Sequence, residues 1–339
     1  MSALQRLIKA AAAAPSHIVL PEGEDIRIIE GGLASVRGGI AKITLLGNQS
    51  AILKKLSGFD GGEAAVKSGD VMILDPVTSD QAEGYAASLL EFRSGKVADK
   101  TAALKLVHDP LVYAAMMVRE GNADGTLGGA VYTTADTVRT ALQIIGKAAD
   151  AKIVSSFFLM VLPKGRHGNE EVVVFSDCGL VVDPDSAQLA GIAIASAASF
   201  KALTNEEPLV GMLSFSTKGS ARHANVSKVS EATALAKELA PNLNIDGELQ
   251  FDAAFVDSVG ASKAPGSEVA GKANVLIFPN LDAGNIGYKI AQRIGGAMAL
   301  GPVLQGLAKP ANDLSRGCTA DDVLNMIAVT VNQVRLSKG

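Results

Sequence analysis

The feature that most constrains the fold is an alternation of short apolar runs with longer segments of helical periodicity. Strand-like runs are predicted at residues 17–20, 42–46, 71–74, 154–162, 172–175, 209–214, 274–278 and 301–304. Helical patterns are predicted at residues 26–36, 81–92, 110–120, 135–145, 187–203, 228–239, 284–295 and 320–335. Because parallel neighbours need a crossover connection, this alternation predicts an α/β protein with a largely parallel sheet.

One region breaks the alternation. Between residues 152 and 175, two strand-like runs flank the polar segment 163–169, which predicts a β-hairpin. The chain has 339 residues, a length typical of about two domains. A change of pattern near residue 150 therefore marks a predicted domain boundary.

The composition excludes several classes of protein. Hydrophobic residues make up 48% of the chain and the net charge is −4, which argues against disorder. A slightly acidic balance with 4% aromatic residues and no Trp argues against a nucleic-acid partner. No apolar run approaches the roughly 20 residues of a membrane span, and Arg6 and Lys9 interrupt the apolar N-terminal residues, which predicts a short amphipathic helix. Two distant cysteines predict a reduced, cytoplasmic protein.

Two familiar site motifs fail in detail. Residues 266–272 match GxxxxGK, but Ala273 follows where a P-loop needs Ser or Thr, and the segment precedes a predicted strand. No GxGxxG follows the first strand, which disfavours an ordinary dinucleotide fold. The histidines show no metal-ligand spacing, so we expect loop or surface positions for them and no metal site.

The glycine-rich segment 123–136 has two interpretations. Thr133 and Asp136 form a capping box at the start of a predicted helix, and a well-capped helix is the simpler reading. In the alternative, the loop and helix N-terminus bind an anion through free backbone N–H groups. Arg139 favours that alternative, because a cation near a helix N-terminus gains nothing from the helix dipole.

A second segment, residues 309–322, is rich in turn-forming residues and also has two interpretations. Thr319 and Asp322 form another capping box, so Asp322 is first of all a cap. The functional alternative is that Ser315, Arg316 and Asp322 gather at one junction and act on an anionic acyl substrate. Cys318 is a nucleophile candidate by type, but a lone cysteine is more often buried and inert.

Blocks along nearly the whole chain resemble the phosphate acetyltransferases, also called phosphotransacetylases. The matching blocks, in order, are residues 18–24, 135–139, 141–145, 155–160, 212–220, 284–289, 305–310 and 312–318. So many blocks in the expected order are far more specific than either capping box.

The resemblance implies the reversible reaction of acetyl-CoA and phosphate to give acetyl phosphate and CoA. It implies a two-domain α/β/α fold resembling isocitrate and isopropylmalate dehydrogenases, with the active site in the interdomain cleft. The expected domains are residues 1–150 with 302–339, and an inserted domain of residues 151–301. A cytoplasmic homodimer is implied, which needs neither metal nor cofactor because CoA is a substrate.

The resemblance also implies roles for particular residues. Asp322 matches the proposed base that takes the proton from the CoA thiol. Ser315 matches a residue that hydrogen-bonds the developing thiolate, and Arg316 one that binds acetyl phosphate. Arg93 and Arg139 match arginines implicated in binding CoA. Three arginines are thus expected to converge on anionic substrates, although the whole chain is nearly neutral.

Four further residues are expected to line the substrate pocket. They are Gly129, Thr133 and Asn285, together with Tyr132 where the family usually has His. Tyr can still hydrogen-bond but does not titrate near neutral pH, so a proton-handling role at this position is in doubt.

Three other functions compete with the acetyltransferase. A phosphate butyryltransferase would use the same chemistry on a longer acyl group. A metal-dependent dehydrogenase on the same fold is disfavoured, since no clear Asp cluster or nucleotide fingerprint is present. A regulatory module that binds acetyl-CoA without catalysis is disfavoured because Ser315, Arg316 and Asp322 are all kept.

Overall fold

A computed structural model describes residues 2–165 and 168–337. The chain forms two compact units. The five-stranded unit comprises Leu7–Ala148 and Leu307–Gly339, and the six-stranded unit comprises Met1–Arg6 and Ala149–Gly306. The chain thus passes between the units near residue 148 and near residue 306, and the domain limits expected from the sequence stay a prediction. The second passage follows strand β10 (Met298–Gln305), which pairs along its length with β5 (Ser155–Leu162).

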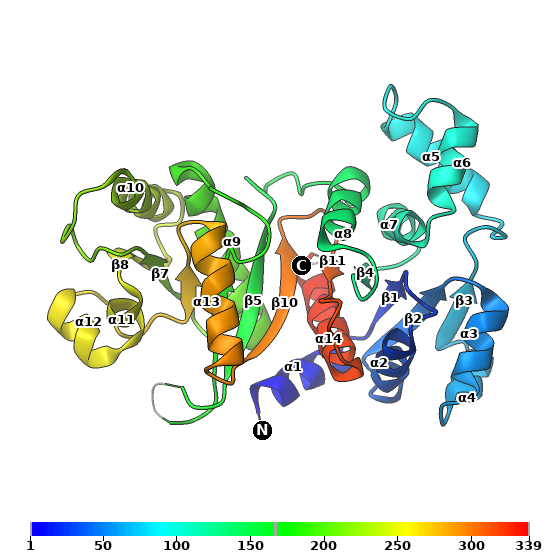
Figure 1. Cartoon of the computed structure of the whole chain (residues 1–339), viewed down its shortest axis with the longest axis horizontal. Coiled ribbons are helices and arrows are strands. Elements are labelled where there is room, and N and C mark those ends of the chain that lie inside the picture. The colour runs from blue at the N-terminus through cyan, green and yellow to red at the C-terminus, as the bar shows by residue number, and fades with distance from the viewer. Residues whose placement is uncertain (1, 166–167, 338–339) are drawn as a thin grey trace. The chain divides into compact units, whose positions relative to one another are not determined.

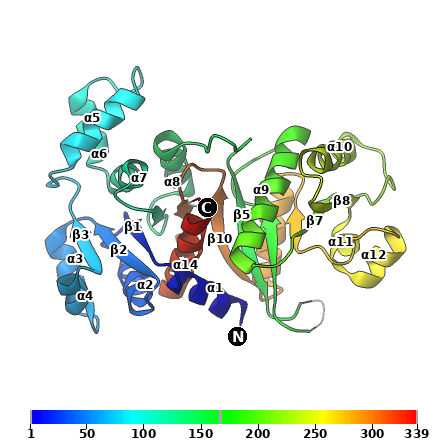
Figure 2. The ribbon, with the colours of Figure 1, turned by 180° about the vertical axis from the view of Figure 1, so that it is seen from behind.

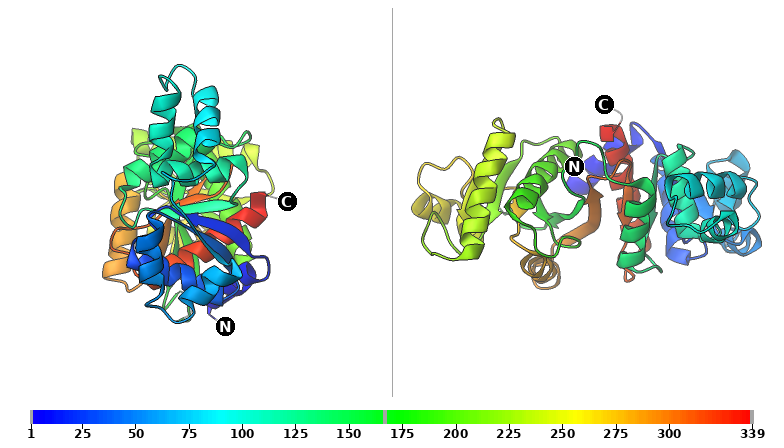
Figure 3. Two further views of the ribbon diagram at one scale, coloured as in Figure 1. Left: turned by 90° about the vertical axis from the view of Figure 1, so that its right-hand side faces the viewer. Right: turned by 90° about the horizontal axis from the view of Figure 1, so that it is seen from above.

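The sheet of the five-stranded unit is entirely parallel (Figure 3, left). Its strand order is β11 (Ala311–Asp313), β4 (Gly125–Gly128), β1 (Ser16–Leu20), β2 (Ala41–Leu46) and β3 (Val71–Leu74). β1 is nearly all buried, as a strand covered by helices on both faces should be. The C-terminal strand β11 lies at the edge of this sheet, beside β4 from the middle of the sequence.

Local signals explain several helix limits in this unit. Asp25 caps α2, and Asp109 caps α7, which has Pro110 in its first turn and ends at Gly121 in the left-handed conformation.

The C-terminal α14 packs on α2 and on β4, with its central residues buried. The helices are α2 (Ile26–Arg37), α3 (Gln49–Leu56), α4 (Gly62–Ser68), α5 (Ala82–Phe92), α6 (Lys100–Val107), α7 (Pro110–Glu120), α8 (Thr134–Thr140), the π-helical turn η1 (Ala141–Ile145) and α14 (Ala320–Ser337). The N-terminal α1 (Ala3–Ala12) begins in the six-stranded unit and ends in this one.

The sheet of the six-stranded unit is mixed. Its order is β10, β5, β6 (Glu171–Ser176), β9 (Val275–Ile277), β7 (Leu209–Leu213) and β8 (Asn244–Leu249). The first three strands are antiparallel and the others are parallel. β5 and β6 form the predicted hairpin, whose connection includes residues 166–167, outside the described part.

The helices of this unit cover both faces of its sheet. α9 (Ser186–Thr204) packs on β6 and β9 and against α10 (Ala224–Leu239), whereas α13 (Leu281–Arg293) lies on the opposite face (Figures 1 and 2). Two short helices, α11 (Phe251–Phe255) and α12 (Asp257–Lys263), precede β9. Within the described residues, α9 alone is long and apolar enough to cross a membrane. Half of its apolar stretch is buried inside the unit, as in a core helix.

The predicted α/β class is confirmed, and each predicted strand and helix has a counterpart. The alternation missed β4, β8 and β11 and the helices α3, α4, α6, α11 and α12. β4 reads Gly-Thr-Leu-Gly and β11 Ala-Asn-Asp, so neither has an apolar run. Both were interpreted as turns, but neighbouring strands recruit them into the sheet.

Candidate active site

The predicted functional loops leave three adjacent parallel strands at the same edge of a sheet. β11, β4 and β1 are neighbours in the five-stranded unit, and Asp313 is in register with Gly128. The Leu314 N–H donates to the Gly128 carbonyl at 2.7 Å, which holds the two loops together where they leave the sheet. Carboxyl ends of parallel strands are where open α/β sheets bind ligands. The fold thus brings the segments 129–133 and 314–322 together, as neither motif alone could show.

The backbone N–H groups of the glycine-rich loop already bind a carboxylate of the protein itself. The buried carboxylate of Glu22, just after β1, accepts hydrogen bonds from the N–H groups of Ala130, Val131 and Tyr132 at 2.7–2.8 Å. Such charge-assisted bonds fix the loop firmly. The prediction that these N–H groups are free for an external anion is therefore wrong at these three positions.

Gly129 lies where the two loops approach most closely. Its φ is 105°, and a Cβ there would overlap Asp313 Oδ1 and fall 2.7 Å from the backbone of Leu314. Asp313, at the end of β11, is fully buried, and neither carboxylate oxygen has a partner in hydrogen-bond geometry. Burial raises the pKa of Asp313 to about 6, and the nearby Thr134 and Thr137 hydroxyls only partly offset it.

Arg27, in the first turn of α2, joins the two loops directly. Its Nη2 donates to the Ala130 carbonyl at 2.9 Å, and its Nη1 donates to the Arg316 carbonyl at 2.7 Å and to that of Cys318 at 3.2 Å. Asp25 holds the guanidinium through a 2.7 Å ion pair, which raises the pKa of Arg27 and lowers that of Asp25. A guanidinium fork suits this task because it donates in several fixed directions.

The capping box predicted at the start of α14 is present. Asp322 Oδ2 accepts from the Thr319 N–H at 2.8 Å and from its hydroxyl at 3.0 Å, while Asp322 N–H donates back to Thr319 Oγ1 at 3.2 Å. The Ser315 and Arg316 side chains are exposed in the preceding loop. Cys318 is buried, and burial raises the pKa of its thiol, which favours the inert interpretation.

The N-cap predicted at the start of α8 is present, but within the described residues the capping box is incomplete, because the Asp136 carboxylate accepts from the Thr133 hydroxyl rather than from its backbone N–H. Thr133 caps the helix, accepting from the Asp136 N–H at 3.1 Å. Arg139 lies in the last turn of the short α8 and not near its N-terminus, so the prediction that it sits unfavourably in the helix dipole is wrong. It pairs with Asp136 one turn earlier, so an internal carboxylate already faces this cation. Tyr132 donates its hydroxyl to Asp109 at 3.3 Å, and burial raises the pKa of the phenol further above its usual range.

Two predicted residues belong to other elements and, within the described residues, no hydrogen bond or ion pair links them to these loops. Arg93 follows the last residue of α5, and among the described residues no hydrogen bond or ion pair joins it to either loop. Asn285 belongs to α13 of the six-stranded unit, where its amide donates to the Cys178 carbonyl at 3.1 Å. The convergence of Arg93, Arg139 and Arg316 on one substrate stays a prediction.

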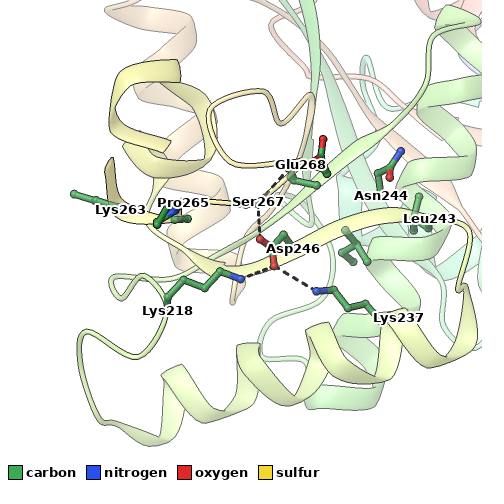
Figure 4. A pocket seen from close by; sticks show the side chains of 13 residues that line it. Lys218, Lys237, Leu243, Asn244, Asp246, Lys263, Pro265, Ser267 and Glu268 are labelled. Carbon is green, nitrogen blue, oxygen red and sulfur yellow. Dashed lines mark hydrogen bonds and ion pairs between the residues drawn. The ribbon is translucent and has the colours of Figure 1, made fainter. Parts of the chain in front are cut away.

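A cavity of about 570 Å³ in the six-stranded unit is not part of this group (Figure 4). It lies along β8 and includes residues 266–269 of the GxxxxGK segment, which precedes a strand as expected. Asp246 pairs there with Lys218 at 2.5 Å and Lys237 at 3.4 Å (Figure 4). Its lysines are thus already balanced by carboxylates, and none of the predicted site residues lines it.

Two residues that hold the loops, Glu22 and Arg27, were not predicted, nor was the buried Asp313 beside Gly129. Glu22 follows β1 and Asp313 is the last residue of β11, so both lie at the same edge of the sheet. Their shared position can be recognised only once β11 is known to be a strand. No three His, Cys, Asp or Glu side chains in the described part gather as a metal site would require.

Comparison with known proteins places these observations in context. Residues 2–331 match the family model described as phosphate acetyl/butaryl transferase. A phosphate acetyltransferase of Acetivibrio thermocellus is 49% identical over 338 residues, covering all of both chains. The crystal structure of a phosphotransacetylase from Streptococcus pyogenes is 40% identical with a TM-score of 0.88, covering 98% of this chain and 99% of that one. A putative 4-hydroxythreonine-4-phosphate dehydrogenase from Salmonella typhimurium has a TM-score of 0.56 at 11% identity over 94% and 99% of the two chains, a likeness of fold alone.

Proposed function

This chain belongs to the phosphate acetyl/butyryl transferase family, and from that premise we propose that it is a phosphate acetyltransferase. It converts acetyl-CoA and phosphate into acetyl phosphate and CoA, reversibly. The observation that carries the proposal is 49% identity over the whole chain to a protein of that name. The meeting of the 129–133 and 314–322 loops at one sheet edge supports it.

The proposed chemistry is a direct transfer between the two substrates. Asp322 takes the proton from the CoA thiol, because the thiolate is the effective nucleophile. The thiolate attacks the acetyl carbonyl of acetyl phosphate, the C–O bond to phosphate breaks, and phosphate leaves. Ser315 hydrogen-bonds the thiolate and Arg316 binds the phosphate, which a guanidinium can do in a bidentate manner. The exposure of both side chains beside Asp322 supports this assignment.

The remaining roles follow the same proposal. Arg93, Arg139 and Asn285 bind CoA or phosphate, and Gly129, Tyr132 and Thr133 shape the pocket beside them. The enzyme uses neither metal nor cofactor, since CoA is a substrate, and it acts on no nucleic acid or membrane. We further propose a cytoplasmic homodimer, and two buried, unpaired cysteines support a reducing compartment.

The decisive experiment is phosphate-dependent CoA release from acetyl-CoA, measured for the wild type and two variants. Asp322→Asn is expected to lower kcat by about a hundredfold or more, the usual contribution of a general base, while CoA still binds. Asp321→Asn is the matched control, because this exposed neighbour occupies the same first helical turn and should keep full activity.

Two results would count against the proposal. An Asp322→Asn enzyme that stays active but melts at a lower temperature would leave the carboxylate as a cap alone. A wild type that binds acetyl-CoA without releasing CoA would be a regulatory module. Comparing rates with acetyl-CoA and butyryl-CoA separates the two acyl transferases within the family.

A further inference from the structure

α7 packs against both of the elements that carry the arginines expected to bind CoA. It contacts α5, and it also contacts α8 and the π-helical turn η1, as the two opposite views show (Figures 1 and 2). Arg93 follows the last residue of α5, and Arg139 lies in the last turn of α8, directly before η1. The spacing between these two arginines therefore depends on how α7 holds its neighbours.

Arg119, in the last turn of α7, contacts both neighbours with one side chain. Its guanidinium carbon lies 3.7 Å from the centroid of the Phe92 ring, and Phe92 is the residue before Arg93. Its Nη1 donates to the Ile144 carbonyl at 2.7 Å, near the end of η1. A guanidinium can make both contacts, because stacking uses its flat face and hydrogen bonding uses its N–H edge. Arg119 thus joins α5 to η1.

The surroundings of Arg119 favour these two contacts over an ordinary surface ion pair. Within the described part of the chain, no carboxylate forms an ion pair with Arg119. The neighbouring Glu120 accepts from the Ser88 hydroxyl at 2.6 Å instead. Carbonyls at the end of a helical segment lack a partner inside it, so the guanidinium supplies one to Ile144. The two contacts therefore account for the position of the guanidinium.

The backbone that carries Arg119 is itself held in place. Lys309 Nζ donates to the Val118 carbonyl at 2.7 Å and to the Arg119 carbonyl at 3.2 Å. α7 then ends at Gly121, whose φ of 83° lies in the left-handed region. Lys309 belongs to the segment that leads into β11, so the end of α7 is fixed to the rest of the unit. Arg119 reaches its two neighbours from this fixed base.

We propose that Arg119 is a positioning residue for CoA, which fixes the spacing between Arg93 and Arg139 so that both meet the phosphate groups of one CoA molecule. Arg119 itself touches neither substrate. Hydrogen bonds from a guanidinium to phosphate depend on direction, so a shift of either arginine weakens them. The inference rests on the proposed function and deepens it, because it names a group that orders the arginines assigned to CoA.

The first test measures the dissociation constant of CoA from the full chain by isothermal titration calorimetry. Arg119→Met keeps an unbranched apolar side chain but removes the charge and the donors, and it should raise the CoA dissociation constant about tenfold. Its kcat and its KM for acetyl phosphate should change by less than about twofold. Arg37→Met is the matched control, because Arg37 ends α2 with a single 3.4 Å contact to the Asp60 carbonyl and should bind CoA as the wild type does.

Substitution of Phe92 tests the stacking contact from its other side. Phe92→Leu keeps an apolar side chain but removes the ring face, and it should raise the CoA dissociation constant about threefold. Phe92→Tyr keeps a ring and should recover most of the affinity that Phe92→Leu loses. Equal losses for the two variants would show that the ring face is not used. Thermal unfolding, followed by circular dichroism, checks that each variant is folded.

A double-mutant cycle separates positioning from general stability. In a chain that already carries Arg93→Met, the further change Arg119→Met should weaken CoA binding by less than about threefold, because one of the two positioned arginines is gone. Fully additive losses would overturn the inference. An Arg119→Met chain that binds CoA as the wild type does, or that loses affinity equally for acetyl phosphate, would also overturn it. A wild type that binds CoA but shows no phosphate-dependent CoA release from acetyl-CoA would instead contradict the proposed function and leave this role of Arg119 standing.

Discussion

At the scale of single residues, carboxylates of the chain itself occupy or face the groups that were expected to bind anionic substrates. Glu22 occupies the N–H groups of the glycine-rich loop, and Asp136 faces Arg139. Asp313 is buried without a hydrogen-bond partner. Carboxylates with partners hold the loops in place, whereas a buried carboxylate without a partner lowers the stability of the folded protein. Measurements of stability can separate the two effects.

Asp313 predicts a specific pH dependence of stability. Its pKa rises from 3.8 to about 6 on folding, so the folded protein takes up a proton that the unfolded chain releases. Burial of Asp313 therefore costs little below pH 4, and stability falls as the pH rises to about 6. Each pKa unit is worth roughly 1.4 kcal/mol, so the full effect is about 3 kcal/mol above pH 6.

Asp313→Asn should remove most of this pH dependence and raise the melting temperature at pH 8 more than at pH 5. Thermal unfolding at several pH values measures it. The exposed Asp321→Asn is the control and should follow the wild type. A wild-type profile that Asp313→Asn leaves unchanged would show that this carboxyl is not the source.

Gly129→Ala should destabilise the protein more than its backbone conformation alone explains. The left-handed region costs an ordinary residue about 1–2 kcal/mol, and the new Cβ would also overlap Asp313. Gly69→Ala is a matched control, because Gly69 is in the left-handed conformation with a φ of 81° and a ψ of 10°, and nothing lies within 4 Å of its Cβ position. Chemical denaturation should show a loss larger by about 1–3 kcal/mol for Gly129→Ala, and equal losses would refute the close approach.

At the scale of elements, the site depends on how the C-terminal segment returns to the first unit. β11 adds to the sheet beside β4, and α14 covers both β4 and α2. Arg27 then ties the loops that follow these strands. Segments from residues 22, 130 and 316 thus meet although about 300 residues separate the first from the last.

Arg27→Lys tests whether this link positions the loops. Lysine keeps the charge but cannot donate in three directions from a planar fork. The variant should lose about tenfold in kcat/KM, mostly in kcat, with a small change in melting temperature. Arg37→Lys, at the exposed end of the same helix, should behave as the wild type. Similar kinetics for both variants would exclude a positioning role for Arg27.

At the scale of the whole molecule, the proposed transfer needs orientation and charge compensation rather than a Lewis acid. The described residues include no cluster of three metal-binding side chains. Under the proposed direct transfer, phosphate-dependent CoA release should survive treatment with EDTA and need no nicotinamide nucleotide. Activity that is lost on chelation and restored by a divalent cation would contradict this.

The sequence by itself determined the class of fold, the hairpin, the capping box of α14 and the N-cap of α8. These features depend on local patterns: apolar periodicity, side-chain caps and turn residues act over a few neighbouring positions. The sequence blocks that resemble the phosphate acetyltransferases also indicated the family, which the comparisons establish. Ser315, Arg316 and Asp322 could be singled out because they lie within eight consecutive residues, and their catalytic roles stay a prediction.

Only the tertiary structure decided which anion the glycine-rich loop binds and which residues join the loops. β4 is a strand because β1 pairs with it, and β11 is a strand because β4 in turn pairs with it; the residues of neither favour a strand by themselves. Glu22 and Arg27 hold the loops through partners about 100 residues or more away in the sequence, a separation that no local pattern encodes. Asp313 likewise lies beside Gly129, far from it in the sequence. The two contacts of Arg119 also became apparent only when the fold placed α5 and η1 beside α7.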